Sequence, residues 1–176
     1  LVLRNNLGQL YETMGLLEEA EPLLKDAISL AETQFGADHP ETARLRNNLA
    51  LIYESQGRFD VAGALYESAI ASLISLYGES NVEIVKLRNN LAFLQFMDED
   101  FDVARAGFES VIEDWVDLAS VDHPERLKSM SNLGRVLLKQ GETDAAEQRL
   151  LEVRALRESK LGSNHIDVIR SNVDVG

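Results

Sequence analysis

Three histidines stand in register in this chain of 176 residues, at His39, His123 and His165, separated by multiples of 42. Imidazole is a common zinc ligand and general base, so a recurring histidine is the first candidate for chemistry. One ion needs its nitrogen ligands at about 2.0–2.1 Å, whereas packed helices lie about 8–10 Å apart. Histidines one repeat apart therefore cannot share an ion, and no metal site is predicted.

Other chemistry-bearing patterns are missing from the sequence. It has no glycine-rich phosphate loop and no G-x-S-x-G motif, and its carboxylates are scattered without a pair suited to acid–base work. The lack of cysteine excludes disulfides, thiolate zinc sites and a cysteine nucleophile. We therefore predict that the chain is not an enzyme and has no cofactor. The absence of cysteine also fits a reducing compartment, and we expect a cytoplasmic location.

The net charge of −13 argues against nucleic acid as a partner, because an acidic surface repels phosphates. Solubility is the simpler explanation of the acidic excess. The sequence contains no run of about 18 apolar residues, so we predict no membrane span. It shows no basic stretch followed by an apolar leader, so we predict no secretory signal.

A 42-residue repeat organises the chain. The letters LRNNL occur at 3–7, 45–49 and 87–91. Within each repeat, apolar residues at helical spacing predict two helices separated by a turn near a glycine such as Gly57. The predicted repeats cover approximately 1–38, 39–80, 81–122 and 123–164, with the start of a fifth at 165–176, in a single array.

Helix starts and close contacts follow from the same alignment. His39 precedes Pro40, a residue suited to the first helical position, so we expect His39 to cap the helix. Small residues recur where the two helices of a repeat must approach closely. Two columns of the alignment have this property: Gly8, Ala50, Ala92 and Gly134; and Ala20, Ala62, Ala104 and Ala146.

These residues resemble a known family. The series Asn6-Leu7-Gly8, Tyr11, Gly15, Leu17, Ala20, Leu24 and Ala27 is similar to the tetratricopeptide repeat. The 42-residue length, with His39-Pro40 and Asn47-Asn48-Leu49-Ala50, resembles the subgroup typified by the kinesin light chain. The resemblance implies an all-α, right-handed solenoid of stacked antiparallel helix pairs, whose first helices line a concave groove that binds peptides or partner proteins.

The third repeat departs from the family pattern. Glu99 replaces the glycine between its helices and Gln95 replaces a tyrosine, so we expect local distortion there. Arg4, Arg46 and Arg88 also occupy a position that is usually apolar in this subgroup. Trp115 is expected to pack in the interior with its indole N–H at an edge.

If the family architecture holds, helical geometry selects the residues that face the groove. The predicted peptide-binding residues are Asn5, Gln9, Arg44, Asn47, Leu51, Lys86, Asn89, Phe93, Phe96, Met97, Lys128, Arg135, Leu138 and Lys139. Amides both donate and accept hydrogen bonds, so the first asparagine of each pair is a candidate to hold a peptide backbone. A solvated helix face is the competing interpretation. The second asparagine is interpreted as bonding to a neighbouring helix or loop.

The charges of this face are opposite to those of the whole chain. Five cations lie on it, with only Glu12 and Glu54 as acids, which favours an acidic segment. Its apolar residues predict an anchor for a large side chain, although core packing or self-association explains them equally well. The predicted function is a protein-interaction module; the alternative is a regulatory segment of a larger signalling ATPase or protease. Exposed terminal helix faces also allow self-association.

Overall fold

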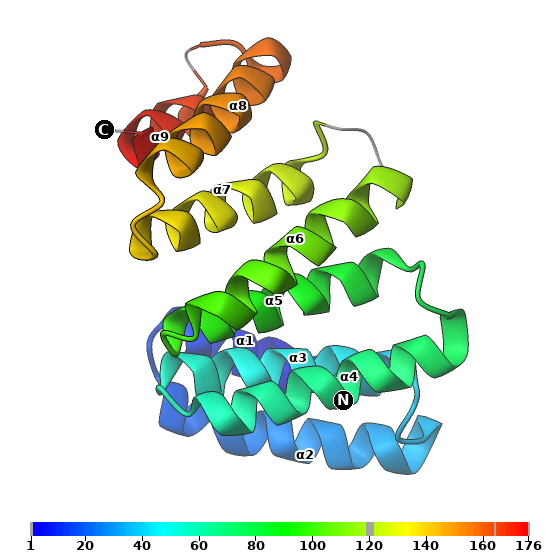
Figure 1. The fold of residues 1–176 in the computed structure, drawn as a ribbon. Coiled ribbons are helices and arrows are strands. Elements are labelled where there is room, and N and C mark those ends of the chain that lie inside the picture. The colour runs from blue at the N-terminus through cyan, green and yellow to red at the C-terminus, as the bar shows by residue number, and fades with distance from the viewer. Residues whose placement is uncertain (1, 119–121, 164, 176) are drawn as a thin grey trace. The chain divides into compact units, whose positions relative to one another are not determined.

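The computed structural model describes residues 2–118, 122–163 and 165–175, and the secondary structure of these residues is all helical (Figure 1). Successive helices pack as adjacent pairs, which confirms the predicted all-α class. The helices are α1 (Val2–Thr13), α2 (Leu17–Phe35), α3 (Pro40–Ser55), α4 (Phe59–Tyr77), α5 (Val82–Met97), α6 (Phe101–Leu118), α7 (Pro124–Lys139), α8 (Thr143–Leu161) and α9 (Ile166–Val175).

The chain forms two compact units, residues 1–94 and 95–176, with α5 contributing to both. In the first unit, residues of α2, α3, α4 and α5 share one apolar core that includes Leu24, Ile52 and Tyr66. In the second unit, α7 packs on both α6 and α8, and α8 packs on α9. The largest buried side chains of this unit are Trp115, Phe108 and Met130.

The predicted cap at His39 is confirmed, and the corresponding residues of three other repeats cap their helices in the same way. The Nδ1 atoms of His39 and His123 accept hydrogen bonds from the backbone N–H groups two residues later, at 3.2 and 3.3 Å. Asn81 Oδ1 and His165 Nδ1 do the same at 2.8 and 3.2 Å. These bonds satisfy donors that a helix start leaves without partners, so the histidine column has a structural role.

Close approach of paired helices explains the column of small residues. A Cβ atom added to Gly134 would lie 2.8 Å from Leu150 Cγ, and one added to Gly8 would lie 2.9 Å from Leu24 Cγ. Ala62 and Ala146 are fully buried on the partner helices. The small residues therefore set the distance between the helices of a pair.

The turn between α5 and α6 keeps the same form as its counterparts, although glutamate replaces glycine there. Glu99 has φ of 64°, close to the 72° of Gly57. The N–H of Asp100 donates to the carbonyl of Gln95 at 2.9 Å, matching the 2.8 Å bond from Arg58 to Tyr53. The expected distortion of the third repeat is therefore absent at this turn, because Glu99 adopts the left-handed conformation itself.

Replacing Glu99 by glycine should stabilise the protein. The left-handed conformation costs a residue with a Cβ about 1–2 kcal/mol, and the extra freedom of unfolded glycine offsets part of the gain. We expect Glu99→Gly to raise the free energy of unfolding by about 0.5–1 kcal/mol, measured by urea denaturation. The reciprocal change Gly57→Glu should lower it by about 1 kcal/mol. An unchanged or lowered stability of Glu99→Gly would contradict this account of the turn.

Trp115 is more deeply buried than expected. Its side chain is 1% exposed and stacks on His123, with ring centroids 4.5 Å apart. The indole N–H is buried and has no hydrogen-bond partner among the described residues, so its predicted place at an edge is wrong. The reason is its column in the repeat, where Ala31 and Leu73 are also core residues.

Among the described residues, α4 is the one helix long and apolar enough to cross a membrane by length and composition alone. Such a signal is weak, because core helices meet the same criteria. In α4, Ala62, Tyr66, Ala69 and Leu73 are buried in the core of the first unit. Packing against α3 accounts for much of the apolar character of this helix.

Candidate functional site

Paired asparagines connect the successive first helices of the first unit. Asn48 Nδ2 in α3 donates to Asn5 Oδ1 in α1 at 2.8 Å. Asn90 Nδ2 in α5 donates to Asn47 Oδ1 in α3 at 3.0 Å. In each case the second asparagine of one repeat bonds to the first asparagine of the preceding repeat. The predicted structural role of the second asparagine is confirmed for Asn48 and Asn90.

The first asparagines are less available than the sequence suggested. Asn5 and Asn89 are only 2% and 3% exposed, and Asn47 is half-buried. The oxygens of Asn5 and Asn47 already accept bonds from the next helix, and their amide nitrogens donate to Asn6 and Asn48 within their own helices. The amides of Asn5 and Asn47, predicted to hold a peptide backbone, therefore form contacts between helices. Each contact joins residues 43 positions apart, one more than the repeat length.

Removing one of these amides should destabilise the first unit. In Asn48→Ala the buried oxygen of Asn5 loses its donor, and an unsatisfied buried polar group costs about 1–3 kcal/mol. We expect the free energy of unfolding to fall by about 2 kcal/mol in urea denaturation. Asn6 occupies the same place in the first repeat and is exposed, so Asn6→Ala is the matched control and should change stability little. Equal effects of the two substitutions would contradict the role given to the Asn48–Asn5 bond.

The cations of the first unit's face are paired with acids of their own helices. Arg44 Nη2 lies 2.6 Å from Glu41 Oε1, and Lys86 Nζ lies 2.8 Å from Glu83 Oε1. The hydrogen bond from Arg44 lowers the pKa of Glu41, and the same bond raises the pKa of Arg44. These pairs were not predicted, although their i,i+3 spacing in the sequence indicates them.

The remaining predicted residues of this unit are mostly half-buried. Leu51 packs against the core of the first unit, and Phe93 is half-buried. Gln9 is exposed and accepts a bond from Asn5 Nδ2 at 3.4 Å. Core packing, one of the three interpretations of the apolar residues, is thus confirmed for Leu51.

Both acids predicted on the face of the first unit are partly withdrawn from solvent. Burial raises the pKa of Glu12. Glu54 Oε2 accepts a hydrogen bond from the Tyr66 hydroxyl at 3.1 Å. Burial, and then the charge of Glu54, raise the pKa of Tyr66 far above its usual value, so the hydroxyl remains a donor to this carboxylate.

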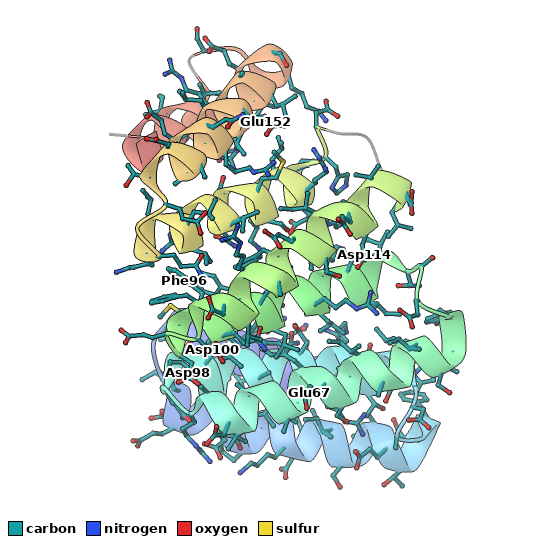
Figure 2. The ribbon with its side chains drawn as sticks, in the orientation of Figure 1. Glu67, Phe96, Asp98, Asp100, Asp114 and Glu152 are labelled. Carbon is teal, nitrogen blue, oxygen red and sulfur yellow. The ribbon has the colours of Figure 1, made fainter. Side chains whose placement is uncertain are left out.

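In the second unit, one apolar and one cationic side chain meet near the ends of α5 and α7. The Arg135 guanidinium lies 5.1 Å from the centre of the Phe96 ring, a cation–π contact. Phe96 is labelled in Figure 2. Met97 and Leu138 are 46% and 44% exposed, and Lys139 is also exposed. We call these five residues the anchor patch.

A cleft of about 850 Å³ opens beside α7, between its first turns, the end of α8 and the start of α9. Lys128 and Arg135 line it as predicted face residues, and Arg157 and Lys160 reach it from α8. Asp122 Oδ2 lies 3.0 Å from Lys160 Nζ, and Glu125 Oε2 lies 3.7 Å from Lys128 Nζ. Arg157 and Lys160 were not predicted, because they lie on the second helix of their repeat and the predicted face consists of first-helix residues.

The described residues include no group of three or more histidine, aspartate or glutamate side chains arranged to hold a metal ion. What this surface offers a ligand is charge, amide groups and apolar area. Such a surface binds other molecules by complementarity.

The family model described as tetratricopeptide repeat matches residues 1–75 and 83–172. The chain belongs to the tetratricopeptide repeat family. Tetratricopeptide arrays are scaffolds that bind other proteins, so this chain is a protein-interaction module. Similar members of this family are typically non-catalytic.

Similar solved structures share the fold at low sequence identity. A Podosopora anserina putative kinesin light chain with nearly identical repeats is 22% identical, with TM-score 0.82, over 98% of this chain and 82% of that one. BtubC (BKLC) from P. vanneervenii is 23% identical, with TM-score 0.81, over 90% of this chain and 63% of that one. Pseudomonas aeruginosa pilF is 20% identical, with TM-score 0.69, over 98% and 66%. A search of curated proteins returned no significant match.

Proposed function

We propose that this tetratricopeptide chain binds an acidic segment of a partner protein that carries one large apolar side chain. The observation that carries the proposal is the anchor patch, where exposed Met97 and Leu138 accompany Arg135 on Phe96. Exposed apolar area next to cations suits a segment with an apolar anchor flanked by carboxylates.

The charge distribution supports an acidic partner in the second unit. The chain carries a net charge of −13, so cations gathered on one surface stand out against a repulsive background. Arg135 and Lys139 lie on the last turns of α7, and Lys128 lies on its first turns. In the first unit, Arg44 and Lys86 hold the same column of the repeat as Lys128, but their glutamate partners reduce the charge they offer.

Charge reversal tests the proposal. A fluorescent peptide of glutamates around one phenylalanine should bind more tightly than the same peptide with glutamines, measured by anisotropy at low salt. Lys128→Glu should weaken binding at least about fivefold and reduce its salt dependence, with a smaller effect of Lys86→Glu. Lys25→Glu in α2 reverses a charge away from this face and is the control. Parent-like binding by both face variants would contradict the proposal.

The charge and the cysteine content of the chain define the expected setting of the partner. We propose a protein ligand in the cytoplasm, with neither nucleic acid nor a membrane as partner, because of the strong negative charge and the absence of cysteine. Self-association through α1 is also proposed, since Leu3 and Leu10 on this helix, and Met14 directly after it, are exposed.

A further inference from the structure

One position of the repeat changes from core residue to cation at α8. Arg157 occupies the column of Ala31, Leu73 and Trp115, which are all buried apolar residues. A cation at a core position is costly unless the site gives it partners or solvent. Arg157 has both, because it lines the cleft and its Nη1 donates to Ser171 Oγ in α9 at 2.7 Å.

Two more positions change from a neutral residue to a cation in the fourth repeat. Lys160 stands in the column of Gln34, Leu76 and Leu118. Arg135 stands in the column of Gln9, Leu51 and Phe93. Neutral residues at these positions in the other three repeats are compatible with the fold, so helix packing does not require the three cations of the fourth repeat.

These three cations meet, with Lys128, at the cleft between α7, α8 and α9. Among the residues that line it, the four basic side chains face three carboxylates, from Asp122, Glu125 and Asp167. The cleft therefore has a small positive excess, whereas the chain is strongly acidic. A volume of about 850 Å³ holds several residues of a peptide rather than a single small ion.

We propose that this cleft is an anion subsite that takes a side-chain carboxylate of the bound segment, with Arg157 and Lys160 as its specificity-determining residues. The inference rests on the proposed function and adds residues of a second helix to it. The bond to Ser171 orients the Arg157 guanidinium in advance, so less entropy is lost when a carboxylate binds its remaining N–H groups. The excess of about one positive charge fits a single carboxylate better than a phosphate dianion.

The repeat itself supplies the test variant. Arg157→Leu/Lys160→Leu installs the residues that the second repeat carries at these positions, Leu73 and Leu76, so the variant should remain folded. Binding of the glutamate–phenylalanine peptide should weaken at least about tenfold, with unchanged circular dichroism and melting temperature not below that of the parent. The control Arg149→Leu removes a cation of α8 that is not among the lining residues of the cleft, and should change affinity less than about twofold.

The possible outcomes separate this inference from the proposed function. If the double variant binds like the parent while Lys128→Glu binds weakly, the cleft inference is overturned and the proposed function stands. If the parent prefers neither the glutamate nor the glutamine peptide, both fail. A third peptide, with phosphoserine replacing one glutamate, tests the ligand class. If the phosphoserine peptide binds more than about tenfold tighter than the glutamate peptide, and the double variant loses this binding, the assignment of the ligand as a carboxylate is overturned.

Discussion

Ala62→Leu is expected to lower the free energy of unfolding by about 3 kcal/mol, the upper end of the usual cost of overpacking. Ala62 lies at the first turn of α4, against α3, and none of its surface is exposed to solvent. Its core cluster includes Leu49, Tyr53 and Tyr66, all nearly or completely buried. The three added carbon atoms have no space, so the helices must separate or the side chains must leave their preferred rotamers.

The matched control for this substitution lies two residues away. Ala64 is in the same helix but exposed, so Ala64→Leu makes the same chemical change without the close contact and should alter stability by less than about 0.5 kcal/mol. Urea denaturation followed by circular dichroism measures both variants. A parent-like transition for Ala62→Leu would mean that the pairing of α3 with α4 is assigned incorrectly.

Arg46→Ala should have the second largest effect, a loss of about 2–3 kcal/mol. Arg46 is a nearly buried cation that connects three parts of the first unit. Its guanidinium donates to the Ala37 carbonyl at 2.9 Å, to Ser72 Oγ at 3.2 Å and to Glu32 Oε1 at 2.8 Å. Hydrogen bonds to a charged group contribute about 1.5–3 kcal/mol each. The net loss is smaller than the sum of the three bonds, because Glu32 is partly exposed to solvent and water replaces some of the lost bonds.

Arg88 is the control, because it holds the same column one repeat later. Its side chain is more exposed, and its partner Glu79 is largely in solvent, 2.9 Å away. Arg88→Ala should therefore cost less than about 1 kcal/mol in the same denaturation experiment. If Arg46→Ala costs no more than Arg88→Ala, the bonds of Arg46 are not what stabilises the connection between α2, α3 and α4.

Much of the fold was predictable because repetition makes each position visible several times. The period of 42, the helical spacing within it and the cap at His39 all depend on interactions close in sequence. The two columns of small residues were also predictable, since glycine is a poor helix former and nothing local favours it at a position such as Gly134. The form of the turn at Glu99 was not predicted, because glutamate at a left-handed position contradicts residue preference.

The candidate site was harder to predict because its properties depend on pairs of helices. A helical wheel places Asn5 and Asn47 on one face, but it does not show that Asn48 and Asn90 bond to them. The wheel also treats one helix at a time, so it did not bring Arg157 of α8 to the cleft beside α7. Contacts between elements far apart in sequence decide which polar groups are available to a ligand.

Mapping of the bound peptide by nuclear magnetic resonance tests the central claim most directly. The glutamate–phenylalanine peptide would be titrated into the isotopically labelled chain, and the amide shifts of the second unit followed. The account predicts the largest changes around Lys128, Arg135 and Leu138 of α7 and around Arg157 and Lys160 of α8. Changes confined to the separate hollow lined by Gln148, Arg149 and Glu152, with none at α7, would contradict it.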